Sequence, residues 1–265
     1  MREGAAGAAN ASLLSVLPFL KARNVRKGRV AQASPWAIGF MLKGLYQLAL
    51  GADGAAWPNA SAALDAATYA HEVLTADGEN SWLRMIDAYA ASMTMEAWSA
   101  EAGSGTMSHP WNAAPAYIIP HFTMGVRALA PAFRRVLIAP MPSLALAAAG
   151  ATLRMPTLRG EIGTSFAWSP GASGSGAGHG TSFKLEFELP GNTAARVCAP
   201  AYLFSVPTSV RLTLDGAPVL SPNTAWDGGC LCVANDVKSG RHILVALTDS
   251  RLSVLSDSEG EEYLL

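Results

Sequence analysis

Near Pro131 the spacing of hydrophobic residues changes from a helical period to the alternation of a β-strand. Before this point, apolar residues recur at helical spacing between recognisable helix caps. After it, the segment 181–189 alternates Phe and Leu with Ser, Lys and Glu, the pattern of a strand buried on one face. We therefore expect an α+β multidomain protein, with a helical domain over 1–130 and an antiparallel β-sandwich over 131–265.

Helix start and stop signals divide the first half into four expected helices. Ser34-Pro35 offers an N-cap hydroxyl and a proline at the first helical position, and Gly51 ends the segment. Apolar residues occupy much of each helix's circumference, so these helices need partners on several sides. We expect Trp36, Trp57 and Trp82 in the core. The expected helices cover 34–50, 59–74, 81–93 and 113–124, the last kinked at Pro120.

Short β-branched segments with regular turns predict the sandwich in the second half. Asp215-Gly216 is typical of a tight hairpin. Residues 230–235 and 242–247 are expected to pair around Lys238-Ser239-Gly240. The Gly- and Ser-rich stretch 169–180 predicts a surface loop that contains a solvated His179. The other expected strands cover 135–138, 181–189, 195–199 and 210–214.

Composition narrows the classes of function. The net charge is −1, with 15% charged residues and no basic run, which gives no electrostatic basis for nucleic-acid binding. No apolar run reaches the length of a membrane span. Cys198, Cys230 and Cys232 are expected to be structural, because their number and spacing fit neither a disulfide framework nor a metal site. We expect no metal and no cofactor. The sequence does not indicate the cellular compartment.

One short stretch concentrates the side chains that sugar chemistry uses. Thr94-Met95-Glu96-Ala97-Trp98 and Ser108-His109-Pro110-Trp111-Asn112 place a carboxylate, an imidazole and two indoles within a short span. An indole face suits the apolar side of a sugar ring, and a carboxylate beside it can transfer protons. Glycoside hydrolysis normally needs two opposed carboxyl groups, and this stretch offers one good candidate.

Four motifs, in this order, resemble the C-terminal part of the bacterial-type α-L-rhamnosidases, glycoside hydrolase family 78. Together they cover the run from Ser81 to Trp168, and the later strands fit the family's terminal sandwich more loosely. The motifs are Ser81-Trp82-Leu83-Arg84-Met85-Ile86 with Thr94-Met95-Glu96-Ala97-Trp98; Ser108-His109-Pro110-Trp111-Asn112-Ala113-Ala114-Pro115; Met124-Gly125-Val126 with Ala130-Pro131-Ala132-Phe133 and Val136-Leu137-Ile138-Ala139-Pro140; and Thr157-Leu158-Arg159-Gly160-Glu161-Ile162 with Trp168.

The resemblance implies an (α/α)6 catalytic barrel of six helical hairpins, followed by a β-sandwich. It implies an inverting hydrolase that releases terminal α-L-rhamnose, in which an acid protonates the glycosidic oxygen and a base activates water. Glu96 matches the family's general base. His109 matches a sugar-holding histidine, and Trp98 and Trp111 match aromatic positions of the substrate site, with Trp98 the weaker candidate for a contact. The implied ligand is a rhamnose-containing glycoside or polysaccharide.

The chain departs from the family because the general acid belongs to an upstream region that this sequence does not contain. Four or five helices are expected here, against the twelve that six hairpins require. The resemblance therefore implies the last third of a barrel, which we expect to be inactive or nearly so by itself. Its exposed apolar helix faces predict association with another chain. The alternatives are a non-catalytic carbohydrate-binding or accessory protein, and another helical-barrel glycosidase or glycoside phosphorylase.

Each candidate residue also has a purely structural interpretation. Glu96 would cap a helix end or pair with an arginine, and His109 would cap the next helix. Trp98 and Trp111 would lie in the core. Four nearby carboxylates offer a replacement acid, but residues close in sequence rarely stand on opposite faces of one ring. They are Glu72, Glu79, Asp87 and Glu101.

Overall fold

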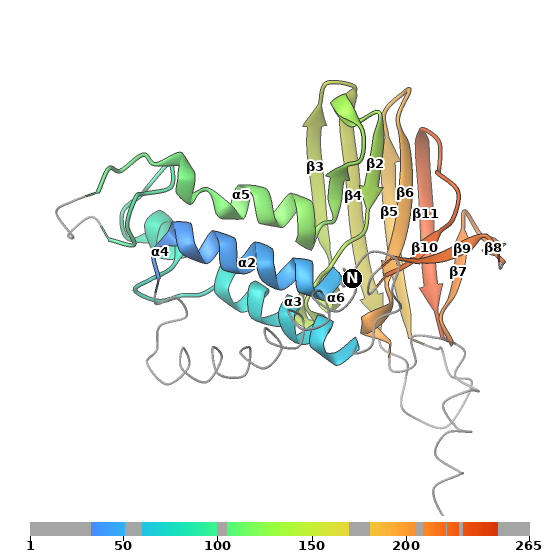
Figure 1. Ribbon diagram of the computed structural model, residues 1–265, viewed down its shortest axis with the longest axis horizontal. Helices are drawn as coiled ribbons and strands as arrows, with labels where there is room; N and C mark the ends of the chain where they lie inside the picture. Colours follow the sequence, from blue (N-terminus) through green and yellow to red (C-terminus); the bar gives the residue numbers. More distant parts are fainter. Residues whose placement is uncertain are drawn as a thin grey trace, which may run out of the picture. The chain divides into compact units, whose positions relative to one another are not determined.

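The computed structural model describes residues 33–50, 60–99, 105–169, 181–204, 209–220, 222–227 and 230–248. The chain divides into two compact units, one helical and one built of sheets (Figure 1). The helical unit runs to Gly125 and also takes in Met141–Ser143 and Asp227–Gly229, and the sheet unit holds the rest. Helices and largely antiparallel sheets make this an α+β protein, as expected.

The helical unit follows the expected helix starts more closely than the expected lengths. The first helix begins after Ser34, whose hydroxyl accepts from the N–H of Ala37 at 3.3 Å. The third is shorter than expected: it ends at Asp87, and Ala90 adopts a left-handed φ of 49° that no helix continues. The elements are α2 (Pro35–Leu50), α3 (Ala60–Leu74), α4 (Trp82–Asp87), the 3-10 turn η2 (Pro110–Asn112), α5 (Ala114–Ile118) and the π-helical turn η3 (Ile119–Thr123).

Helices α2 and α3 form the core of this unit. Alanines on α3 let the helices approach closely, while Leu42 and Leu45 of α2 are buried between them. The buried Tyr46 stacks on Phe122 at 5.2 Å and its hydroxyl shares a 3.0 Å hydrogen bond with Thr123. Burial raises the pKa of Tyr46 to about 12 despite that hydrogen bond. None of the described helices has both the length and the hydropathy that a membrane span requires.

Helix α2 also contacts α5, and a glycine makes this contact possible. A Cβ on Gly39 would lie 2.8 Å from the Cβ of Ala114, closer than any real pair of such atoms. Beyond Ile118 the helix widens into the π turn that contains Pro120, since proline cannot donate the usual backbone hydrogen bond. The expected kink at Pro120 is therefore a change of helix type.

The sheet unit is a β-sandwich of a six-stranded and a five-stranded sheet. The six-stranded sheet has the order β3-β4-β5-β11-β7-β8, and Figure 1 shows its long strands side by side. The five-stranded sheet has the order β1-β2-β6-β10-β9. A short helix, α6 (Leu144–Ala149), packs on β4. The strands are β1 (Val126–Ala128), β2 (Arg135–Ile138), β3 (Ala151–Thr157), β4 (Gly160–Ser169), β5 (Ser182–Leu189), β6 (Ala194–Pro200), β7 (Arg211–Leu214), β8 (Ala217–Val219), β9 (Thr224–Asp227), β10 (Cys230–Val233) and β11 (Gly240–Leu247).

The alternation of β5 is confirmed. Phe183, Leu185, Phe187 and Leu189 are buried, while the polar residues between them face solvent. The sheets are not wholly antiparallel, because β2 and β6 pair in parallel with Ile138 opposite Val197. Strands β3 and β4 were not expected, since their polar and small residues give a weak hydrophobic signal.

One expected hairpin is present and the other is wrong. Asp215 and Gly216 both have positive φ and join β7 to β8. Partial burial raises the pKa of Asp215, but hydrogen bonds from His242 and the Ile243 backbone outweigh it and lower the pKa below its usual value. Strands β10 and β11, in contrast, lie in different sheets, because β10 pairs with β6 and β11 lies between β5 and β7.

Two of the three cysteines form a disulfide, contrary to the expectation from their spacing. Cys198 on β6 and Cys232 on β10 are directly opposite in register, with Cα atoms 3.9 Å apart. Cys230 stays a buried thiol in the same cluster. All three are structural in position, as expected. The Gly- and Ser-rich loop with His179, as well as Trp57 and Glu101, lies outside the described residues.

Candidate functional site

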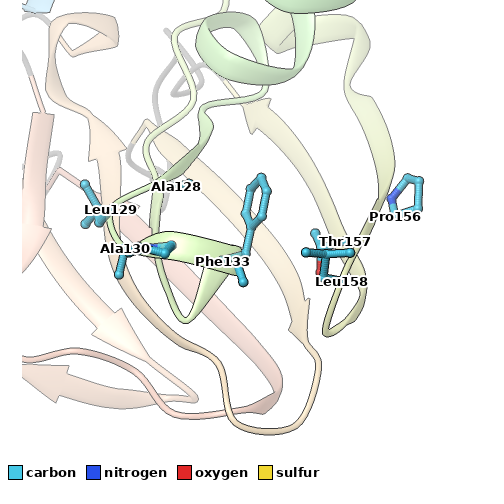
Figure 2. Close-up of a pocket in the computed structure, with 9 residues that line it drawn as sticks. Ala128, Leu129, Ala130, Phe133, Pro156, Thr157 and Leu158 are labelled. Atoms are coloured by element: carbon cyan, nitrogen blue, oxygen red, sulfur yellow. The ribbon is translucent and has the colours of Figure 1, made fainter.

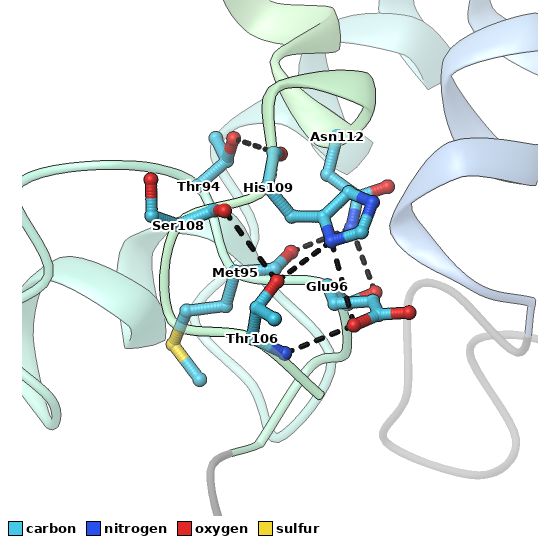
Figure 3. A network of polar contacts seen from close by, with 7 residues as sticks. All are labelled: Thr94, Met95, Glu96, Thr106, Ser108, His109 and Asn112. Carbon is cyan, nitrogen blue, oxygen red and sulfur yellow. Dashed lines mark hydrogen bonds and ion pairs between the residues drawn. The ribbon is translucent and has the colours of Figure 1, made fainter. Parts of the chain in front are cut away.

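Two loop segments of the helical unit run alongside each other and carry the candidate residues (Figure 3). The N–H of Glu96 donates to the carbonyl of Thr106 at 3.0 Å, and the N–H of His109 donates to the carbonyl of Thr94 at 2.7 Å. The Thr94 hydroxyl donates back to the His109 carbonyl at 2.9 Å. These backbone contacts bring together residues that lie on separate motifs of the sequence.

At the centre of this pairing, Glu96 and His109 face each other. Oε2 of Glu96 lies 3.4 Å from Nδ1 of His109 and accepts the backbone N–H of Thr106 at 2.9 Å. The Thr106 hydroxyl lies 2.7 Å from the same imidazole nitrogen. The side chains of Glu96 and His109 are 31% and 25% exposed, so both are held in place and still reach solvent. A carboxylate in that setting can accept a proton from water.

Asn112 supports the loop that carries Glu96, a role that the sequence analysis did not assign to it. Its side-chain amide is fully buried and donates to the carbonyls of Met95 and Glu96, at 2.5 and 2.7 Å. The backbone carbonyl of Asn112 accepts the indole N–H of Trp82 at 3.0 Å. The sequence analysis also did not name Thr106, which contacts both Glu96 and His109. The asparagine's place in the same motif as His109 was the available signal.

The four tryptophans of this region divide into two pairs. Trp82 and Trp98 are buried in edge-to-face contact, and the Trp98 N–H donates to the Ala33 carbonyl at 2.6 Å. Trp98 therefore supports the wall of the site and presents no open ring face. Trp111 is 55% exposed and its ring lies 4.1 Å from that of His109. Trp36, expected in the core, is 47% exposed and lies beside Trp111.

Three of the four candidate acids lie within the described residues, and none of the three is bonded to Glu96. Among the described residues, no hydrogen bond or ion pair links Glu96 to a second carboxyl group, and Glu72, Glu79 and Asp87 are exposed. The described residues also contain no group of His, Cys, Asp or Glu that could hold a metal ion. The arrangement supplies one proton acceptor, one imidazole and an aromatic face.

The sheet unit has a separate hollow of about 750 Å³ at one end of the sandwich (Figure 2). The turn that contains Ala132 and Phe133, both with positive φ, forms one side, and Pro156, Thr157 and Leu158 form the other. Arg159 fixes the turn by donating to the Ala132 carbonyl at 3.0 Å. Its lining has no titratable side chain, so we assign it no chemistry.

One family model matches part of the sheet unit. Residues 125–210 match the family model of the bacterial alpha-L-rhamnosidase C-terminal domain. The rhamnosidase match starts where β1 begins and ends just before β7, so it covers the first part of the sandwich. It includes the hollow and Arg159 but not Glu96 or His109. No curated protein matches the chain.

One of the solved structures that resemble the chain supports a related fold. An alpha-L-rhamnosidase from Dictyoglumus thermophilum superposes with a TM-score of 0.54 at 16% identity, over 71% of this chain and 20% of its own. The Streptomyces avermitilis alpha-L-rhamnosidase complexed with L-rhamnose gives 0.49 at 22% identity, over 67% of this chain and 16% of its own. An alpha-L-rhamnosidase from Aspergillus terreus gives a TM-score of 0.42 at 18% identity, over 79% of this chain and 23% of its own. The chain thus spans about a fifth of the length of the first of these.

Proposed function

We propose that this chain is the C-terminal part of an inverting α-L-rhamnosidase, with Glu96 as the general base. The observation that carries the proposal is the Glu96–His109 pair, which lies 3.4 Å apart beside an exposed indole. The rhamnosidase match over 125–210 and the related fold support it. In this proposal the helices belong to the last third of an (α/α)6 barrel, and the sandwich forms the second domain.

In the proposed reaction, water attacks the anomeric carbon of a terminal α-L-rhamnosyl unit. Glu96 takes a proton from that water, the glycosidic bond breaks, and the leaving oxygen receives a proton from an acid. His109 holds the sugar, and Trp111 covers its apolar side. Because the acid is not supplied by the described residues, the chain by itself is inactive or nearly so toward ordinary glycosides. Loss of acid help lowers a rate by about 10²–10⁴-fold.

A glycosyl fluoride separates the two catalytic roles, because fluoride leaves with little help from an acid. The chain is expected to hydrolyse α-L-rhamnosyl fluoride slowly, with inversion, and to leave an aryl α-L-rhamnoside intact. Glu96→Gln should abolish the fluoride hydrolysis, whereas Glu72→Gln, which alters an exposed carboxylate of the same unit, should not. Rapid aryl rhamnoside turnover that depends on Glu96 would contradict the proposed inactivity.

The second candidate is a non-catalytic carbohydrate-binding or accessory protein. The exposed indoles beside His109 favour it, since they would bind sugar without any acid. Binding of L-rhamnose that His109→Ala weakens, together with no Glu96-dependent fluoride hydrolysis, would favour this candidate over the hydrolase.

A further inference from the structure

Three exposed aromatic rings continue from the Glu96–His109 pair along the helical unit. Next to His109 is Trp111, whose ring lies 6.2 Å from that of Trp36. Trp36 in turn contacts Phe40 edge-to-face at 4.9 Å, one turn further along α2. We call Trp111, Trp36 and Phe40 the aromatic shelf.

The shelf is open to solvent although it consists of large apolar rings. Trp111 is 55% exposed, Trp36 47% and Phe40 60%. Single exposed apolar residues are common, but three contiguous aromatic rings mark a binding surface. The two α2 members share one helix face because they are four residues apart.

The chemistry of the shelf fits sugar better than a protein surface. Its members are rings, which pack against the C–H face of a pyranose, and one end of it adjoins a carboxylate and an imidazole that can bond hydroxyl groups. A saccharide presents this combination of an apolar face and a polar edge along its whole length.

We propose that the aromatic shelf extends the sugar site: beyond the ring that His109 holds and Trp111 covers, Trp36 and Phe40 bind further sugar rings of a rhamnose-containing oligosaccharide. This rests on the proposed sugar site and adds a substrate class to it: a saccharide of several rings rather than a small glycoside. The shelf residues are binding residues and take no part in proton transfer.

Titration calorimetry on the full chain tests the shelf with L-rhamnose and with α-linked rhamnose di- and tetrasaccharides. Affinity should rise with length. Trp36→Ala and Phe40→Ala should each weaken tetrasaccharide binding by about 2- to 10-fold, the range expected for one aromatic contact, and leave L-rhamnose binding unchanged. Trp36→Phe should retain most of the effect. Leu158→Ala, at an exposed apolar residue of the sheet unit, is the matched control.

Two results would overturn the proposal. One is equal affinity for all three saccharides. The other is a change of self-association in Trp36→Ala, seen by sedimentation velocity, with no change in tetrasaccharide affinity, which would make the shelf a protein interface. The fluoride assay is independent: if it fails while length-dependent binding persists, the catalytic role of Glu96 is wrong and the shelf stands.

Discussion

Asn112 shows how one buried amide can hold a site together. Its side-chain nitrogen donates to the backbone carbonyls of Met95 and Glu96, in the loop that carries the carboxylate. Its backbone carbonyl separately accepts the indole N–H of Trp82. A buried carbonyl without its partner costs about 1–3 kcal/mol. The position of the Glu96 backbone therefore depends on a residue that is itself completely buried.

Asn112→Ala is expected to lower the free energy of unfolding by about 2 kcal/mol or more, since it leaves both carbonyls unpaired. Asn112→Asp keeps the shape but turns a carboxylate oxygen toward those carbonyls, and should be at least as damaging. Chemical denaturation followed by circular dichroism measures both. Asn223→Ala, at an exposed position of the sheet unit, should be close to neutral. An unchanged midpoint in Asn112→Ala would contradict this account.

At this scale the sequence named Glu96 and His109 as candidates but not how they are brought together. Glu96 and His109 meet because two loops pair through backbone hydrogen bonds, and such loops have no hydrophobic period to predict from. Their proposed roles came from family resemblance. Trp36 was expected in the core because it is a large apolar residue at helical spacing, but it is half exposed. Helical spacing does not reveal whether another element covers that face of the helix.

Helix α2 is the element on which the shelf and the helical core both depend. Its contact with α5 requires that residue 39 lack a side chain, because the Cβ of Ala114 occupies the space. Glycine normally weakens a helix by about 1 kcal/mol relative to alanine. The close approach thus outweighs helix propensity at this position.

Gly39→Ala should therefore destabilise the chain, because overpacking of about 1–3 kcal/mol exceeds the gain in propensity. Adding Ala114→Gly removes the opposing methyl group and should recover part of the loss. A double-mutant cycle measured by denaturation gives the coupling. Gly44→Ala, where no atom stands in the way, is the matched control and should stabilise. Additive single effects at Gly39 and Ala114 would refute the contact.

Elements with a strong period were predictable and irregular ones were not. α2, α3 and β5 lie where caps and alternation placed them. The pairing of β10 and β11 was wrong because nearness in sequence favours a hairpin, whereas each strand is used in a different sheet. The disulfide follows from that same topology, which places Cys198 opposite Cys232.

On the scale of the whole chain, exposed apolar residues of the helical unit predict self-association. Ile86 is 61% exposed, Met93 50% and Met107 49%, and burying such side chains from water is favourable. Sedimentation velocity at rising protein concentration should show association. Ile86→Gln together with Met93→Gln should reduce it, and Leu220→Gln in the sheet unit should not. A monomer at all concentrations would contradict the prediction.

Met141 belongs to the helical unit although the chain on both sides of it builds the sheet unit. It is completely buried, and its N–H lies 3.1 and 3.2 Å from the carbonyls of Phe122 and Thr123. The two units are therefore interleaved in the chain. A version that begins at Val126 would keep Met141 but lose those carbonyls. An exchange of the helices at a single crossover therefore leaves Met141–Ser143 behind, and the incoming helices must place two backbone carbonyls where those of Phe122 and Thr123 lie.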